Sequence, residues 1–262
     1  MKTTWPIFLV SVLFLHAHLS LAAPPEEVTF PSGSFALKGF LYKPEGPGPF
    51  PAILYSHGSE RRPGAKPEIG NFFAAKGYAV FVPHRRGHGR SPADRQVDAL
   101  YDQGARGVVA LHELHLEDTL AALAYLRSQP YVDSRRVAAA GCSYGGIQTL
   151  LAAEKGSGIA AAVAFAPGAE TWSRSTALQA RLRRAVKGAT VPILFIQAEN
   201  DWDLTPTLVL DRDMEAAGKP HKRVIFPPYG QTHEDGHGGF CFRATDVWGG
   251  AVLDFLSGAL KR

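Results

Sequence analysis

Short apolar runs alternate with stretches of helical spacing along most of the chain. The β-rich runs cover residues 51–56, 78–82, 136–140, 159–166, 192–197 and 223–226. Between them, apolar positions recur every three or four residues, the spacing of amphipathic helices, in residues 68–76, 114–128, 144–155, 176–187, 207–217 and 245–260. Strands that alternate with helices of about 10 to 15 residues predict a mostly parallel sheet with helices on both faces.

The beginning of the expected mature chain departs from this alternation. Residues 24–50 are rich in Pro and Gly around two apolar stretches, residues 27–30 and 35–42, which predict an opening β-hairpin. With the six later runs, these stretches predict an eight-stranded, mostly parallel sheet in a single α/β domain of residues 23–262. Functional sites in such sheets form at the carboxyl ends of the strands.

The first 22 residues predict a secretory signal peptide, which we exclude from the fold. Lys2 gives a positive start, residues 7–15 form a short apolar core, and residues 20–22 supply small side chains at the cleavage position. An uncleaved membrane anchor is the alternative, but the apolar core is shorter than the roughly 20 residues of a spanning helix. We therefore expect an exported protein, secreted or periplasmic, with no stable membrane span after cleavage.

Composition and charge narrow the possible partners. Of the 262 residues, 45% are hydrophobic and 20% are charged, an ordinary balance for a globular domain with a large core. The net charge of +4 comes without a basic run interleaved with aromatic residues, so no nucleic acid partner is expected. The two cysteines, Cys142 and Cys241, allow one disulfide in an exported protein, and the sequence leaves open whether they pair.

Residues 141–146, Gly-Cys-Ser-Tyr-Gly-Gly, have Gly-x-Ser-x-Gly spacing between an expected strand and an expected helix. A sharp turn of this kind strains its central residue and lifts that side chain clear of the sheet. Side chains two residues either side would collide with the neighbouring strand and helix, so glycine is needed there. A glycine-rich loop without a catalytic role is the alternative. The central position belongs to Ser143, so this serine is the predicted nucleophile, and Cys142 should point back into the fold.

Four stretches resemble the α/β-hydrolase superfamily, and within it the dienelactone-hydrolase and prolyl-oligopeptidase-like serine hydrolases. They are residues 54–58 (LYSHG), 77–91 (GYAVFVPHRRGHGRS), 136–146 (RVAAAGCSYGG) and 236–237 (GH). The resemblance implies an α/β-hydrolase fold with a minimal cap and a triad in the chain order Ser, Asp or Glu, His. Dienelactone hydrolases proper carry cysteine at the nucleophile position, so Ser143 argues against that particular activity.

A serine hydroxyl needs a base to take its proton and a third group to orient the base. The acid is expected on the loop after the strand at 192–197. Asp201 matches the family's acid position, with Asp203 and Glu199 as alternatives, and capping of the next helix is the competing structural role of Asp201. Two later aspartates lie within that predicted helix and are expected to be solvated: Asp211 and Asp213.

The base must follow the acid, which leaves three histidines: His221, His233 and His237. His221 precedes a strand and therefore lies at the wrong edge of the sheet. Residues 229–240 form a glycine-rich stretch after the last strand, and a loop here can carry a side chain over the correct edge. His237 lies in the Gly-His pair that resembles the family motif and is the predicted base, with His233 as the alternative.

The oxyanion of an acyl-transfer reaction needs two backbone N–H donors. Tyr144 supplies one at the start of a helix, where the helix dipole also favours negative charge. We expect Ser59, on the loop after the strand at 51–56, to supply the other, with Glu60 as the alternative. His57 is expected to be a structural, hydrogen-bonded residue.

No cofactor and no metal are expected. Residues 112–115, His-Glu-Leu-His, lack the spacing of a His-Glu-x-x-His zinc site because the second histidine comes one residue early. His84 and His88, in a His-Arg-Arg-Gly-His-Gly turn, are expected to brace the floor of the site.

These residues predict an exported serine hydrolase that cleaves carboxylic esters through an acyl-enzyme. A small single-domain peptidase of prolyl-oligopeptidase type is the main alternative, although peptidases of that group carry a large propeller domain for which this chain has no room. A non-catalytic binding protein on the same fold is a further alternative. Acyl transfer to an acceptor other than water would use the same acyl-enzyme, so the sequence does not distinguish it from hydrolysis.

The segment 168–190 lies where caps are inserted in this fold, and it is too short for a full lid. Trp172 and Leu178 are predicted to wall an acyl pocket. Five basic residues of this segment are expected to form a solvated helix face, with attraction of anionic substrates as the alternative: Arg174, Arg181, Arg183, Arg184 and Lys187.

Overall fold

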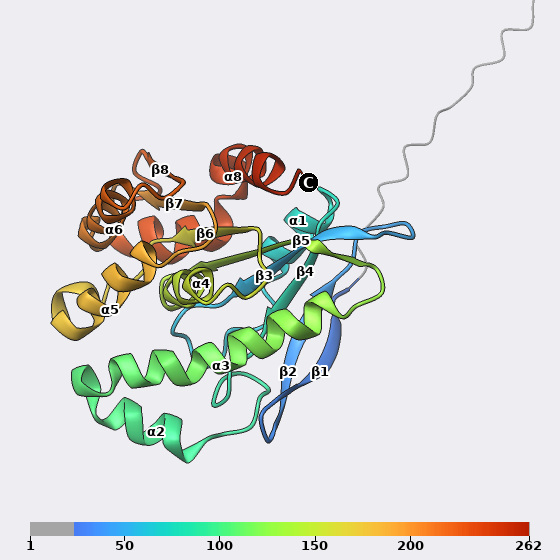
Figure 1. The fold of residues 1–262 in the computed structure, drawn as a ribbon, viewed down its shortest axis with the longest axis horizontal. Helices are drawn as coiled ribbons and strands as arrows, with labels where there is room; N and C mark the ends of the chain where they lie inside the picture. The colour runs from blue at the N-terminus through green and yellow to red at the C-terminus, as the bar shows by residue number, and fades with distance from the viewer. Residues whose placement is uncertain (1–23, 262) are drawn as a thin grey trace, which may run out of the picture.

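An eight-stranded sheet forms the centre of the computed structural model, which describes residues 24–261 (Figure 1). The strands are β1 (Glu26–Ser32), β2 (Phe35–Tyr42), β3 (Phe50–Ser56), β4 (Ala79–Pro83), β5 (Val132–Cys142), β6 (Ala161–Phe165), β7 (Ile193–Ala198) and β8 (His221–Phe226). They lie in the order β1-β2-β4-β3-β5-β6-β7-β8. The β1–β2 and β2–β4 pairs are antiparallel and the other pairs are parallel, which confirms the predicted hairpin and the mostly parallel sheet.

Helices cover both faces of this sheet (Figure 1). They are α1 (Pro67–Ala74), α2 (Arg95–Asp102), α3 (Val108–Arg127), α4 (Tyr144–Glu154), α5 (Thr176–Lys187), α6 (Thr205–Ala216), α7 (Phe240–Arg243) and α8 (Thr245–Ala259). Three short turns are η1 (Gly104–Arg106), η2 (Trp172–Arg174) and the π-helical η3 (Asp235–Gly239). Side chains of α3, α4, α5 and α6 share one core with the sheet, and those of α1, α7 and α8 share the other.

Two helical segments differ from the sequence prediction. The prediction of a glycine-rich loop at 229–240 is wrong for the second half of this stretch. There, η3 and α7 run through residues 235–243 and bury Phe240 and Cys241 against the sheet. Helix α2 was not predicted, because it is polar and buries only Val97, so its apolar spacing is weak. Asp94 is the N-cap of α2, and its side chain accepts a hydrogen bond from the backbone N–H of Gln96 at 2.8 Å.

Alternation along the central strands decides which side chains meet which helices. In β5, Val137 and Ala139 belong to the core beneath α3 to α6, whereas Ala138, Ala140 and Cys142 belong to the core beneath α1, α7 and α8. The final residue of β5 therefore points toward α7. There the thiols of Cys142 and Cys241, both buried, form a disulfide.

This disulfide settles the pairing that the sequence left open, and it has a specific position. It joins the residue before Ser143 to the helix that follows His237, across 99 positions of the chain. The bond therefore links the two segments that carry the predicted nucleophile and the predicted base.

The segment between β6 and β7 consists of η2 and α5, and α5 packs against α4 and α6 on one face of the sheet. Among residues 24–261, none of the helices combines the length and the hydropathy that crossing a bilayer requires. The predicted signal peptide at residues 1–22 lies outside the described residues.

Replacing Cys142 and Cys241 together by alanine should lower the free energy of unfolding by about 3–5 kcal/mol, because the bond restricts the unfolded chain over a long loop. Urea denaturation of the oxidised wild type and of the double variant measures this difference. Equal unfolding free energies for the two proteins would contradict the prediction.

Candidate active site

Ser143 occupies a strained turn between β5 and α4. Its backbone has φ 56° and ψ −113°, and a positive φ is uncommon for a residue with a side chain. The flanking glycines are required sterically. A Cβ at Gly141 would lie 2.5 Å from the carbonyl oxygen of Gly145, and a Cβ at Gly145 would collide with the carbonyl oxygen of Ser56. The backbones of β3, β5 and α4 therefore pass as closely as the sequence predicted.

Asp201 and His237 come together although 36 positions separate them. Asp201 lies on the loop after β7 and His237 in η3, and the His237 Nδ1–H donates to Asp201 Oδ1 at 2.8 Å. The Asp201 side chain has no solvent exposure, and its Oδ1 also accepts from the backbone N–H of Trp202 at 2.6 Å. The structure therefore brings the predicted acid and base into contact in the orientation a triad needs.

Asp203 and His233, the alternative candidates for the acid and the base, form other hydrogen bonds. Asp203 Oδ1 accepts from the backbone N–H of Thr205, the first residue of α6, at 2.8 Å. His233 is exposed, and its Nδ1 hydrogen-bonds to the carbonyl of Asn200 at 3.0 Å.

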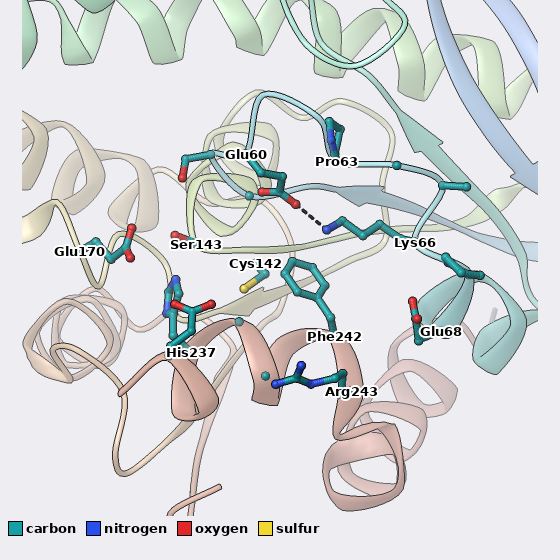
Figure 2. A pocket seen from close by; sticks show the side chains of 18 residues that line it. Glu60, Pro63, Lys66, Glu68, Cys142, Ser143, Glu170, His237, Phe242 and Arg243 are labelled. Carbon is teal, nitrogen blue, oxygen red and sulfur yellow. Dashed lines mark ion pairs between the residues drawn. The ribbon is translucent and has the colours of Figure 1, made fainter. Parts of the chain in front are cut away.

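Ser143 and His237 line one cavity of about 610 Å³ (Figure 2). Its walls come from the loop after β3, the start of α1, the Ser143 turn and the η3–α7 segment, with Glu170 added from the loop after β6. Figure 2 shows Ser143, Glu170 and His237 grouped at one end of this cavity. At the other end, Lys66 forms an ion pair of 2.5 Å with Glu60 and lies 3.8 Å from the centre of the Phe242 ring.

The charges around His237 set its protonation. Burial lowers the pKa of its imidazole, but the hydrogen bond and charge of Asp201, followed by the charges of Glu170 and Glu234, outweigh burial and raise the pKa above its ordinary 6.5. The imidazole is therefore a stronger base than an isolated histidine.

Arg85 holds the loop that carries the predicted oxyanion donor. Its guanidinium is buried and donates to the carbonyls of His57 at 2.9 Å and Gly58 at 2.7 Å. Ser59 follows directly and lines the cavity, while Tyr144 begins α4. Sequence reasoning did not single out Arg85. The available signal was its position two residues after the buried strand β4, which indicates a buried arginine. A buried guanidinium must find hydrogen-bond acceptors nearby.

Five buried histidines form a connected group of rings next to Tyr144, the residue after Ser143: His57, His84, His88, His112 and His115. The Tyr144 ring packs on His112 with centroids 3.9 Å apart, and its hydroxyl shares a hydrogen bond of 2.7 Å with His115 Nδ1. The prediction that His57 is structural is confirmed, since its Nδ1 bonds to the Gly58 carbonyl at 2.9 Å. His84 Nε2 bonds to the carbonyl of Gly64, a residue of the cavity wall, which agrees with the expected bracing role.

The acyl-pocket residues lie elsewhere. Among the described residues, those that line the cavity do not include Trp172 or Leu178. Both side chains are buried in the core beneath α3 to α6, because the apolar face of α5 turns inward onto α4. The structure therefore does not place Trp172 and Leu178 at the predicted nucleophile.

Several residues expected to be solvated are buried ion-pair partners. Arg181 is 4% exposed and pairs with Glu113 and Glu154, so the expectation of a solvated face on α5 is wrong at this position. Asp211 pairs with Arg223 at 2.5 Å, and Asp213 pairs with Arg183 at 2.6 Å. The two aspartates on α6 are each 7% exposed, and the prediction that they are solvated is wrong.

The chain is similar to known hydrolases over most of its length. The model of the Dienelactone hydrolase family matches residues 37–245. The Quorum-quenching protein AidA of Acinetobacter baumannii (strain MDR-ZJ06) is 31% identical over 156 residues, which are 59% of this chain and 47% of that protein. The chain therefore spans less than half the length of this curated relative.

Solved structures show the fold. An acylaminoacyl peptidase of Pyrococcus horikoshii superposes with a TM-score of 0.71 at 20% identity, over 92% of this chain and 42% of that one. Est1E from Butyrivibrio proteoclasticus, solved with ferulic acid bound, superposes with a TM-score of 0.67 at 18% identity, over 90% of this chain and all of that one. Both likenesses support an α/β-hydrolase fold.

Acidification should destabilise the protein through the buried histidines. Burial, followed by the charge of Arg85, lowers the pKa of His88 and of His112 to about 3. An unfolded histidine binds its proton near pH 6.5, so the unfolded state binds more protons than the folded state below that pH, and stability is lost as pH falls.

Each such histidine should remove roughly 1 kcal/mol of stability per pH unit between about pH 6 and pH 4. Urea denaturation at pH 6.5, 5.5 and 4.5 measures the loss. Replacement of His112 by Gln should flatten the dependence, and replacement of the exposed His233 by Gln is the matched control. A pH dependence that is the same in wild type and His112→Gln would contradict the assignment.

Proposed function

Because the chain belongs to the dienelactone hydrolase family, we propose that it is a serine hydrolase that cleaves carboxylic esters. The observation that carries the proposal is the hydrogen bond between Asp201 and His237, in a cavity that His237 shares with Ser143 on its strained turn. No cofactor enters the proposed reaction.

Ser143 attacks the ester carbonyl carbon with its hydroxyl oxygen, while His237 accepts the hydroxyl proton. The tetrahedral oxyanion is held by the backbone N–H groups of Ser59 and Tyr144, the second at the N-terminus of α4. His237 then returns the proton to the departing alkoxide, and the alcohol leaves an acyl-enzyme on Ser143. Asp201 orients the imidazole and stabilises its charged form throughout.

Water completes the cycle in the same geometry. His237 takes a proton from a water molecule, whose oxygen attacks the acyl carbon, and the proton passes to the Ser143 oxygen as the carboxylic acid is released. A different hydroxyl compound at this step would turn hydrolysis into acyl transfer.

The size of the cavity suits a small ester. Its volume of about 610 Å³ lies within the usual range of small-molecule sites, roughly 300–1,000 Å³. Cleavage of a short peptide is the second candidate, favoured by the likeness to an acylaminoacyl peptidase, although this chain covers 42% of that protein. We further propose export, which the Cys142–Cys241 disulfide supports because such bonds persist in oxidising compartments.

Ser143→Ala should lower the hydrolysis of p-nitrophenyl esters, from acetate to decanoate, by a factor of about 10⁴ or more, because it removes the nucleophile. Wild-type initial rates should be highest for the short acyl chains. Ser257→Ala, which changes an exposed serine on α8 outside the proposed triad and the cavity, is the matched control. Wild-type turnover by Ser143→Ala would contradict the mechanism, and cleavage of peptides but not of esters would favour the second candidate.

The wild-type kcat/KM should rise with pH through an apparent pKa above 6.5, because only the neutral His237 accepts a proton and its pKa is raised. Asp201→Asn should move this pKa downward, because the amide removes a negative charge beside the ring, and should lower kcat by about 10³–10⁴. Rates between pH 5 and pH 9 test both effects. An apparent pKa that Asp201→Asn leaves unchanged would exclude His237 as the titrating base.

A further inference from the structure

Trp202 is a large apolar side chain beside the predicted catalytic acid. It follows Asp201 directly and is 49% exposed. Within residues 24–261, Val247 is the one other large hydrophobic side chain of comparable exposure, at 42%. A single exposed tryptophan needs no functional explanation on its own, so its surroundings decide the case.

The surroundings form a second hollow next to the catalytic cavity. This hollow has a volume of about 430 Å³ and is lined by Ala169, Glu170, Ser173, Arg174, Trp202 and Asp203. Glu170 also lines the cavity that contains Ser143 and His237. In Figure 2 its carboxylate lies beside Ser143 and His237. The two hollows therefore share Glu170 as a wall residue.

The tryptophan is held in position from two sides. Its backbone N–H donates to Asp201 Oδ1 at 2.6 Å. Its ring packs against His233 with centroids 5.2 Å apart and a tilt of 32°, and His233 in turn bonds to the carbonyl of Asn200. An aromatic surface that is already ordered loses little conformational entropy when a ligand binds.

We propose that this second hollow, the Trp202 subsite, binds an aromatic ring of the ester substrate against the indole of Trp202. The inference rests on the proposed ester hydrolysis and adds a substrate class, esters with an aromatic ring in the acyl or the alcohol part.

The chemistry of the walls distinguishes a ring from an alkyl chain. Trp202 is the one aromatic side chain among the residues that line the hollow, and Glu170, Ser173, Arg174 and Asp203 surround it. An alkyl chain would meet polar walls over most of its length. A flat ring gains stacking on the indole and presents its edge, with any polar substituents, to those walls.

The test compares kcat/KM for three esters: ethyl acetate, benzyl acetate and ethyl phenylacetate. The last two place the ring in the alcohol and in the acyl part, so they identify which end of the substrate the subsite holds. In the wild type, at least one ring ester should be preferred over ethyl acetate. Trp202→Ala should reduce that preference by roughly tenfold, mainly through KM, and Trp202→Phe should restore most of it.

Val247→Ala removes a comparably exposed apolar side chain on α8 and should leave the preference unchanged. The inference is overturned if the ratio of ring ester to ethyl acetate is the same in wild type and Trp202→Ala. It is also overturned if the ratio falls together with a shift of the apparent pKa, because the substitution then acts through Asp201. Turnover of ethyl acetate without ring preference rejects only the subsite, whereas no turnover of any ester rejects the proposed function as well.

Discussion

The close passage of three backbones at Ser143 is the constraint on which the site depends. The turn joins the end of β5 to the start of α4, and the carbonyl of Ser56 in β3 lies beside it. Neither Gly141 nor Gly145 has space for a side chain. The turn directs Ser143 into the cavity. Cys142, the residue before it, also lines this cavity and is bonded to Cys241 in the helix that follows the predicted base.

Electrostatic groups on the two sides of this turn act differently. On the cavity side, the buried Asp201 and the nearby Glu170 favour a protonated His237, which a general base needs after it accepts a proton. Behind the turn, buried histidines stay neutral because burial and Arg85 lower their pKa values. Arg85 is then a permanent positive charge that also fixes the carbonyls preceding Ser59.

Most of the strand and helix order could be predicted, because buried strands are continuous apolar runs and long helices have clear periodicity. Ser143 followed from motif spacing, whereas the choice of Asp201 and His237 also needed the resemblance to the hydrolase family, and the structure places these two in contact. The disulfide could not be predicted, because it depends on the register of β5 relative to α7. Trp172 and Leu178 were misplaced, because apolar spacing shows which side chains of a segment are buried but not what they pack against.

The central claim is that His237 activates Ser143 for nucleophilic attack. Its most direct test is covalent labelling by a serine-directed phosphonate, followed by intact mass and peptide mapping. The account predicts one phosphonyl group per chain, attached to Ser143, with labelling at least about 100-fold slower in His237→Gln because the hydroxyl then lacks its base. Labelling at another residue, or an equal rate in His237→Gln, would contradict it.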